Sequence, residues 1–191
     1  IMAFYFRPFP KVTYDIKKNK LPLLLTNVTA RYKIRDELKQ RAAIFYNYTV
    51  KEQDTPSNVA FRYYDDETLD WVIMLVNDII DPYYDWPLSY ANFIEYMKTL
   101  YGSVDTAMAT TYEYRKILNP QKVLFDGTVI PKRTVVIDQN TYNSLAPADR
   151  EEIDAYEYYE EQNNLKRNIK ILDKSYIGLI KTQVETIFAQ I

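Results

Sequence analysis

The chain has 191 residues, enough for one compact domain or for a small domain with extensions. Its formal net charge is −2, without a basic footprint, which argues against nucleic acid as the main partner. It contains neither cysteine nor histidine, which excludes disulfides, thiolate chemistry, the usual nitrogen–sulfur zinc sites and histidine-activated nucleophiles.

Two other counts bear on function. Glycine occurs only 3 times, which excludes a glycine-rich phosphate loop. Tyrosine occurs 19 times, and tyrosine offers large apolar area with a polar end, so its abundance favours protein–protein contact surfaces over simple core filling. No apolar run reaches the roughly 18 residues of a membrane helix, and the N-terminus lacks a signal-peptide pattern, so we expect no membrane partner and synthesis in the cytoplasm.

Residues 1–43 are predicted to form an N-terminal arm and a short helix. The opening stretch "IMAFYFRPFP" is aromatic, and Pro8 and Pro10 forbid a helix there, so the arm is expected to be extended. A short helix is predicted to follow Asn27.

Residues 44–82 carry the clearest pattern, a strand followed by two helices. The aromatic and β-branched stretch 41–51 predicts the strand. Thr55 as N-cap and Pro56 at the first helical position predict the first helix. The second helix is expected to open at Asp65 or Asp66, to be apolar nearly all round and therefore buried, and to end at residues 77–78.

Residues 83–140 predict a more irregular middle segment. A helix is expected to start at Ser89 and to stop at Gly102 in a left-handed cap. The stretches "TTYEYRKIL" and "RTVVID" predict strands, with a turn around "FDGT".

Residues 141–191 predict a C-terminal helix–strand–helix extension. The first helix is expected over 147 to about 164, the strand at "RNIKIL", and the last helix over 175–189. The residues of the last helix expected to face inward are Ile177, Ile180, Val184 and Ile187 or Phe188.

Acidic residues gather at 151–161, where two carboxylates could in principle act together in glycoside hydrolysis. That chemistry needs one desolvated acid and one ionised acid at a fixed separation, and nothing apolar isolates any carboxylate here. The run is therefore predicted to be a solvated helix face. The pairs Asp65/Asp66 and Asp78/Asp81 are interpreted as helix-cap and loop acids. We expect no catalytic residue, no metal and no cofactor.

The stretch "YNYTVKEQDTPSNVAFRYYDDETLDWVIMLVNDIIDP" resembles the LysM module, whose signature is a strand, a D-T turn and two helices ending in asparagine. The matching positions are Tyr48, Val50, Asp54, Thr55, Ala60, Tyr63 or Tyr64, Trp71, Val72, Ile73 and Asn77. A LysM module closes with a second strand soon after the asparagine. Here "PYYDWPLS" follows instead, and the nearest stretch that resembles that strand is "DGTVIP" at 126–131. LysM modules bind N-acetylglucosamine polymers between two loops, here 53–56 and 77–80.

Most of the chain resembles the LysM-containing baseplate wedge protein family of T-even-like contractile-tailed phages. The resemblance includes the aromatic arm, "NDIIDPYYDWPLS" and the N-x-x-K-R-x-I-K-I-L block at 163–172. It implies a structural subunit of the virion tail baseplate, assembled in the host cytoplasm. The implied partners are the central helical wedge subunits, the sheath-initiating wedge protein and neighbouring wedges, which the protein would help to join into a ring.

We therefore expect an α+β fold with a LysM-like βαα core, an N-terminal extended arm and a C-terminal helix–strand–helix extension. Trp86, between Pro82 and Pro87, is expected at the surface as an interface anchor. The candidate partner-binding residues are Phe4, Phe6, Tyr83, Tyr84, Trp86, Ile169 and Ile171. Two rival functions are a peptidoglycan-binding LysM module and a cell-wall hydrolase; the second lacks the residues that it would need.

Overall fold

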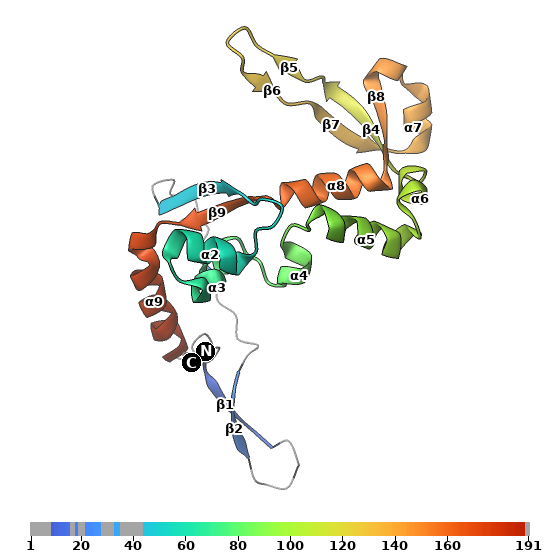
Figure 1. The fold of residues 1–191 in the computed structure, drawn as a ribbon. Helices are drawn as coiled ribbons and strands as arrows, with labels where there is room; N and C mark the ends of the chain where they lie inside the picture. The colour runs from blue at the N-terminus through green and yellow to red at the C-terminus, as the bar shows by residue number, and fades with distance from the viewer. Residues whose placement is uncertain (1–8, 16–17, 19–21, 28–32, 35–43, 190–191) are drawn as a thin grey trace. The chain divides into compact units, whose positions relative to one another are not determined.

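The computed structural model describes residues 9–15, 18, 22–27, 33–34 and 44–189. The chain divides into two compact units, of which unit 1 comprises residues 1–86 and 167–191 and unit 2 comprises residues 87–166. Unit 2 is thus inserted into the sequence of unit 1 (Figure 1). This division cuts across the four consecutive segments expected from the sequence.

Unit 1 is built around two antiparallel strands that are distant in sequence. Strand β3 (Phe45–Thr49) pairs with β9 (Asn168–Leu172), so the predicted strands at 41–51 and at "RNIKIL" are both present and lie side by side. The predicted helix after Asn27, the first residues of the arm and residues 41–43 lie outside the described residues.

Two helices follow β3 where the sequence predicts them. Helix α2 (Pro56–Tyr64) begins after Thr55, whose side chain accepts a hydrogen bond from the Asn58 amide at 3.2 Å. The second predicted helix is a 3₁₀ turn, η2 (Glu67–Leu69), that continues into α3 (Asp70–Val76). Asp66 caps η2 by accepting from the Thr68 amide, which confirms its interpretation as a cap acid.

The core of unit 1 lies between these helices and β9. The buried side chains of this core include Val59, Ala60, Val72, Ile73 and Ile171. Helix α9 (Ile177–Ala189), preceded by η4 (Lys174–Tyr176), adds Ile177 to it. Val184 of the same helix is buried against Phe9, whereas Ile187 is exposed. The C-terminal helix therefore belongs to the core of unit 1.

The described part of unit 1 also contains a two-stranded ribbon and a short helix. Strands β1 (Lys11–Tyr14) and β2 (Leu23–Thr26) form an antiparallel ribbon. The four-residue helix α4 (Pro82–Asp85) follows α3, and Asp81 caps it by accepting from the Tyr83 amide at 2.9 Å.

Unit 2 combines helices with a small sheet. Helix α5 (Tyr90–Tyr101) begins after Ser89 and ends at Gly102, which has a φ of 81°, as predicted. Helix α6 (Val104–Met108) follows. Strand β4 (Thr111–Asn119) pairs antiparallel with β7 (Arg133–Ile137), which confirms both predicted strands in this region.

The remaining elements of unit 2 surround that strand pair. The "FDGT" turn joins β5 (Lys122–Val123) to β6 (Val129–Ile130). Helix α7 (Gln139–Ser144) and the 3₁₀ turn η3 (Pro147–Asp149) follow β7. A second core holds Phe93, Met97 and Ala107, with Tyr156 and Tyr159 packed against it.

The helix predicted over 147 to about 164 is wrong in its first half. Residues Arg150–Asp154 form strand β8 on the other side of β4, and helix α8 (Ala155–Leu165) begins only afterwards. Asp154 caps α8 by accepting from the Glu157 amide at 2.8 Å. The acidic residues suggested a helix by propensity, but pairing with β4 and burial of Ile153 decide the conformation.

The fold is therefore mixed α+β, as predicted, and its strands form small antiparallel sheets. Among the residues that the structure describes, no helix is both long enough and apolar enough to span a bilayer. Within the same residues, no group of three acidic side chains is placed to hold a metal ion.

Candidate partner-binding site

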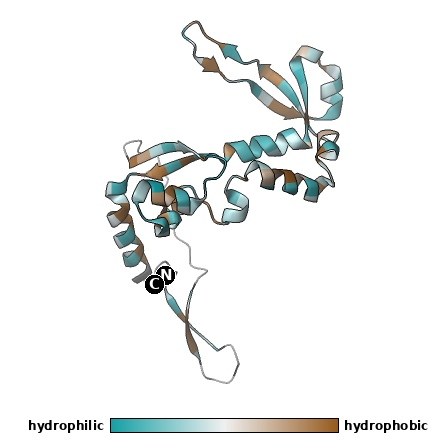
Figure 2. Ribbon diagram, in the orientation of Figure 1, coloured by the Kyte–Doolittle hydropathy of each residue, from teal (hydrophilic) through white to brown (hydrophobic). Residues whose placement is uncertain are grey.

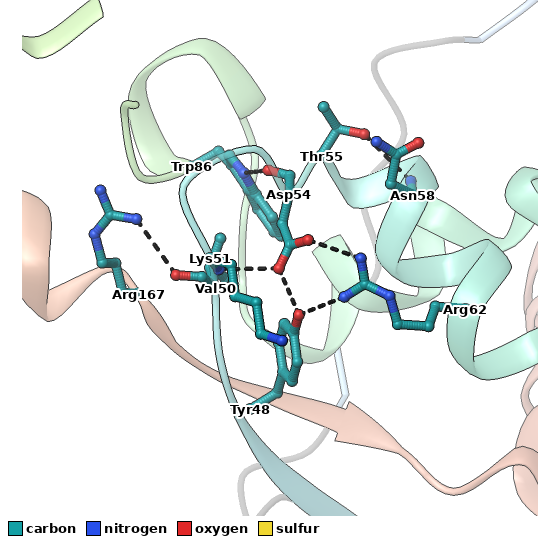
Figure 3. Close-up of polar contacts among 9 residues, drawn as sticks. All are labelled: Tyr48, Val50, Lys51, Asp54, Thr55, Asn58, Arg62, Trp86 and Arg167. Carbon is teal, nitrogen blue, oxygen red and sulfur yellow. Dashed lines mark hydrogen bonds and ion pairs between the residues drawn. The ribbon is translucent and has the colours of Figure 1, made fainter. Parts of the chain in front are cut away.

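The loop between β3 and α2, residues 50–55, is organised around the carboxylate of Asp54 (Figure 3). One carboxylate oxygen accepts hydrogen bonds from the Tyr48 hydroxyl and from the Lys51 amide, the latter at 2.9 Å. The other oxygen pairs with Arg62 at 3.0 Å, and Arg62 also donates to the Tyr48 hydroxyl at 2.7 Å. Both carboxylate oxygens are thus used inside the protein.

This network shifts the pKa values of its members. Burial alone would raise the pKa of Asp54, but hydrogen bonds from Tyr48, Arg62 and a backbone amide outweigh it, so the pKa lies below its ordinary value. Burial, followed by the hydrogen bond to Asp54, raises the pKa of Tyr48 to about 12. Asp54 is therefore held ionised and Tyr48 neutral, which suits a structural brace and not an acid–base pair.

Trp86 lies in the core and not at the surface, so the predicted position of this side chain is wrong. Its side chain is only 7% exposed, and the indole Nε1 donates to the Asp54 carbonyl at 2.9 Å (Figure 3). The short helix α4 turns the chain before Trp86, and Asp85 stabilises that turn by accepting from the Ile80 and Asp81 amides. A buried indole needs an acceptor, and the loop carbonyl provides one.

The same loop holds the residue at which the chain returns to unit 1. The Val50 amide donates to the Arg167 carbonyl at 2.8 Å, and the Arg167 guanidinium donates to the Val50 carbonyl at 3.3 Å. Residues 50–55 therefore contact both Trp86, where the chain leaves unit 1, and Arg167, where it comes back. We call these residues, with Trp86 and Arg167, the junction.

A matching contact closes the ends of unit 2. The side chain of Asn163, which is buried, accepts from the Leu88 amide at 2.7 Å and donates to the Leu88 carbonyl at 3.0 Å. In unit 1 the residue before the insertion and the residue after it both contact the loop at 50–55. In unit 2 the residues near its first and last positions, Leu88 and Asn163, contact each other.

The two residues that mark the expected glycan groove also have structural roles. Thr55 caps α2. The Asn77 amide group donates to the carbonyls of Ile73 and Lys170, each at 2.8 Å, and its oxygen accepts from the Lys170 amide at 2.8 Å. Asn77 therefore ties the end of α3 to β9, and its side-chain hydrogen-bonding groups are engaged within unit 1.

Ile169 and Ile171 do not present a surface in this structure. Both point into the core from β9, and Ile171 is 0% exposed. Alternation along a strand places these two positions on the same face, which α2 and α3 cover. The expectation that Ile169 and Ile171 face a partner is therefore wrong, because both side chains are buried in the core of unit 1.

Tyr83 and Tyr84 of α4 do lie at the surface. Tyr83 is 86% exposed, and Ile80 beside them is exposed as well. Their predicted role in partner binding is untested and stays a proposal. Phe4 and Phe6 lie outside the described residues.

Sequence reasoning missed a second exposed surface, the two-stranded arm at residues 118–133. Every residue in this range is exposed, and Phe125 at its turn is fully so. Figure 2 shows hydrophobic stretches along both strands of the β5–β6 hairpin. The signal was present as "VLFDGTVI" between Pro120 and Pro131, an apolar hairpin without a neighbouring apolar helix to cover it.

The acidic run at 151–161 is not one solvated helix face, because β8 and α8 share it. Arg115, whose side chain is 12% exposed, pairs with Glu113 of its own strand and, through two nitrogens, with Glu161 of α8. The hydrogen bond to Glu161 is the largest cause that raises the pKa of Arg115. Lys132 pairs with Glu151. The Arg115–Glu161 pair joins the sheet of unit 2 to α8, whereas the Lys132–Glu151 pair lies within the sheet region.

Comparison with known proteins identifies the family. The chain is similar over residues 2–187 to the family described as base plate wedge protein 53. It is also similar to the baseplate wedge protein gp53 of Enterobacteria phage T4, with 30% identity over 84 residues, an alignment that covers 43% of this chain and 42% of the T4 protein. The family is a structural, non-enzymatic component of the phage tail baseplate in the virion, as the resemblance implied. This chain belongs to the base plate wedge protein 53 family.

Proposed function

We propose that this chain joins wedge proteins in the inner baseplate through protein–protein contacts. Its partners would be the central helical wedge subunits, the sheath-initiating wedge protein and neighbouring wedges. Family membership supports association with other baseplate proteins in general. The identity of each partner is the proposed part.

The observation that carries this proposal is the exposed arm at 118–133. Its apolar side chains, among them Val123, Phe125 and Val129, are exposed. A two-stranded hairpin by itself is marginally stable in water, so such an arm gains order and buried area when a partner covers it. Tyr83 and Tyr84 supply a second exposed aromatic surface of the type that interfaces favour.

The proposal includes a LysM-like core in unit 1. In chain order β3, α2, α3 and β9 are a strand, two helices and a strand, and the two strands are antiparallel. The closing strand would then be β9, which follows the inserted unit 2. The stretch at 126–131 that resembles the closing strand of a LysM module lies instead in the β5–β6 hairpin of unit 2.

Glycan binding by this core is the weaker reading. The loops 53–56 and 77–80 would flank the groove, yet Asp54, Thr55 and Asn77 already make hydrogen bonds within unit 1. Groups committed in this way would have to break internal bonds before they bound a sugar. The core then serves as a rigid base for the exposed surfaces.

Co-assembly with the other wedge proteins of the same tail tests the proposal. The double variant Phe125→Ser/Val129→Ser removes apolar area from the arm, and Leu165→Ser, which alters an exposed leucine elsewhere, is the control. We expect the double variant to fold but to be lost from the purified wedge complex, while the control is retained. Normal incorporation of the double variant, together with retention of the wild-type chain on N-acetylglucosamine polymer, would favour the glycan reading.

A further inference from the structure

The arm at 118–133 has few internal contacts to hold it. Its two short strands share only the pairs Lys122↔Ile130 and Val123↔Val129, and Asn119 pairs with Arg133 at the base of the arm. The turn adds hydrogen bonds from the Leu124 amide to the Thr128 carbonyl at 2.8 Å, from the Gly127 amide to the Leu124 carbonyl at 3.0 Å and from the Thr128 amide to the Asp126 carboxylate at 2.9 Å. Because every residue from 118 to 133 is exposed, apolar contacts within unit 2 contribute little to its order. A surface that covered the arm would supply the apolar contacts that unit 2 does not.

Charge restricts what that surface is. The arm carries the cations Lys122, Lys132 and Arg133 against the single acid Asp126, although the whole chain has a net charge of −2. Lys132 already pairs with Glu151 of unit 2. A surface that receives this arm should therefore combine exposed apolar or aromatic groups with acidic side chains.

Among the described residues, a surface of that chemistry that contains no lysine or arginine lies at residues 78–85, which we call the α4 patch. Ile80, Tyr83 and Tyr84 are exposed there. Asp78, Asp81 and Asp85 lie in the same stretch, which contains no lysine or arginine. Asp81 and Asp85 also hold the turn of α4 through backbone amides, so their positions are fixed by the fold. The α4 patch is thus aromatic and acidic where the arm is apolar and basic.

We propose that the arm of one copy docks on the α4 patch of a second copy. This inference rests on the proposed function as an assembly subunit and names one of its contacts. The two surfaces belong to different parts of the chain, so the contact is heterologous, and repetition from copy to copy builds a ring or an open filament. The hydrophobic contacts of Phe125 supply area, and the opposite charges set the orientation.

Site-directed cross-linking tests this contact directly, because the natural chain contains no cysteine. Two full-length variants are made, Thr128→Cys in the arm and Ile80→Cys in the α4 patch, and one of them carries a tag that changes its mass. They are mixed and treated with a short bismaleimide. The control mixture replaces Ile80→Cys with Leu165→Cys, an exposed position outside both surfaces.

We expect the mixed arm–patch dimer to exceed both same-variant dimers and the control product. A mixed dimer no more abundant than the control product would overturn the proposal. A chain that carries both cysteines and closes on itself at a rate independent of concentration would overturn it too, because the arm would then reach its own patch.

A charge reversal sharpens the result. Lys122→Glu in the arm variant should lower the yield of the mixed dimer about two- to fivefold, the loss expected for one exposed ion pair. Lys181→Glu changes the net charge equally, but it lies in α9, outside both surfaces, and should have no effect. Equal loss with both variants would contradict the proposal.

Incorporation into the wedge complex distinguishes the contact between copies from the proposed assembly function. If the chain joins the other wedge proteins but the mixed dimer does not form, the contact between copies is wrong and the proposed function stands. If the mixed dimer forms but the chain joins no wedge protein, the proposed function is wrong.

Discussion

The junction and the arm use their residues in opposite ways. At the junction, the Asp54 carboxylate and carbonyl and the Trp86 indole all have hydrogen-bond partners inside unit 1. In the arm, every residue from 118 to 133 is exposed, including the large apolar side chain of Phe125. The side chains of the first region are used within the fold, while the second leaves its apolar side chains exposed.

The difference shows that aromatic content alone does not identify an interface. Tyr83 and Trp86 stand three positions apart around the same short helix, yet Tyr83 is exposed and Trp86 is buried. Trp86 packs in the hydrophobic core of unit 1 and its indole donates a hydrogen bond to the Asp54 carbonyl, whereas Tyr83 has no place in that core. An aromatic side chain that has found an internal partner stabilises the fold, and one that has not is available for binding.

The largest expected change in the free energy of unfolding follows a substitution of the buried Trp86. Trp86→Ala should lower the free energy of unfolding by about 3–5 kcal/mol, because it leaves a cavity in the core of unit 1 and removes the hydrogen bond to Asp54. Trp86→Phe should cost less, since it keeps a buried ring. Urea denaturation followed by circular dichroism measures both.

Tyr83→Ala is the matched control for Trp86→Ala and should change the free energy of unfolding by less than about 0.5 kcal/mol. If Trp86→Ala were as stable as Tyr83→Ala, the distinction between the two aromatics would be lost.

A smaller loss is expected at Asn77, which ties α3 to β9. Asn77→Ala removes the bonds to Ile73 and Lys170 and should cost about 2 kcal/mol in the free energy of unfolding. Asn164→Ala, an exposed asparagine of α8, is the control and should be near neutral. Thermal unfolding compares the two variants. Equal stability would argue against a stabilising role for the Asn77 hydrogen bonds.

The Asp54 network should make the stability of the protein depend on pH. Because the pKa of Asp54 is depressed in the folded protein, its contribution to stability is complete above the ordinary aspartate pKa of about 4 and is lost as pH falls through the lower folded value. The stability advantage of wild type over Asp54→Asn should therefore be present at neutral pH and shrink in acid. Denaturation across pH checks this, with Glu95→Gln, an exposed acid of α5, as the control.

The arm should have the smallest effect on folding. Phe125→Ser/Val129→Ser should change the free energy of unfolding by less than about 0.5 kcal/mol, because neither side chain is buried. Chemical denaturation gives the value, and a cost comparable to that of Trp86→Ala would show that the arm belongs to the core.

Helices α2 and α5 were predictable from the sequence because their caps are local, whereas the shorter helices α4, α6 and α7 were not predicted although they too have local caps. Thr55 with Pro56 marks the start of α2, and Ser89 and Gly102 mark the ends of α5, because each cap depends on a few neighbouring residues. Strand β8 was hidden, since its acidic residues resemble a helix and only the pairing with β4 shows otherwise.

The candidate site was less predictable because it depends on distant contacts. Trp86 packs in the core and bonds to the Asp54 carbonyl, which is distant in sequence, and the pairing of β3 with β9 spans the whole inserted unit 2. No local pattern around Ile169 or Ile171 distinguishes a strand covered by helices from one that faces a partner. Tyr83 and Tyr84 were expected at the surface from the aromatic stretch between two prolines, but the same argument was wrong for Trp86.

Hydrogen exchange on the full-length chain, free and within the assembled baseplate, tests the central claim most directly. The Val50 and Lys51 amides, bonded to Arg167 and Asp54, should exchange slowly in both states. The amides at 122–130 should exchange fast in the free chain and become protected on assembly. An arm that is already protected in the free chain, or that stays unprotected in the baseplate, would contradict the account.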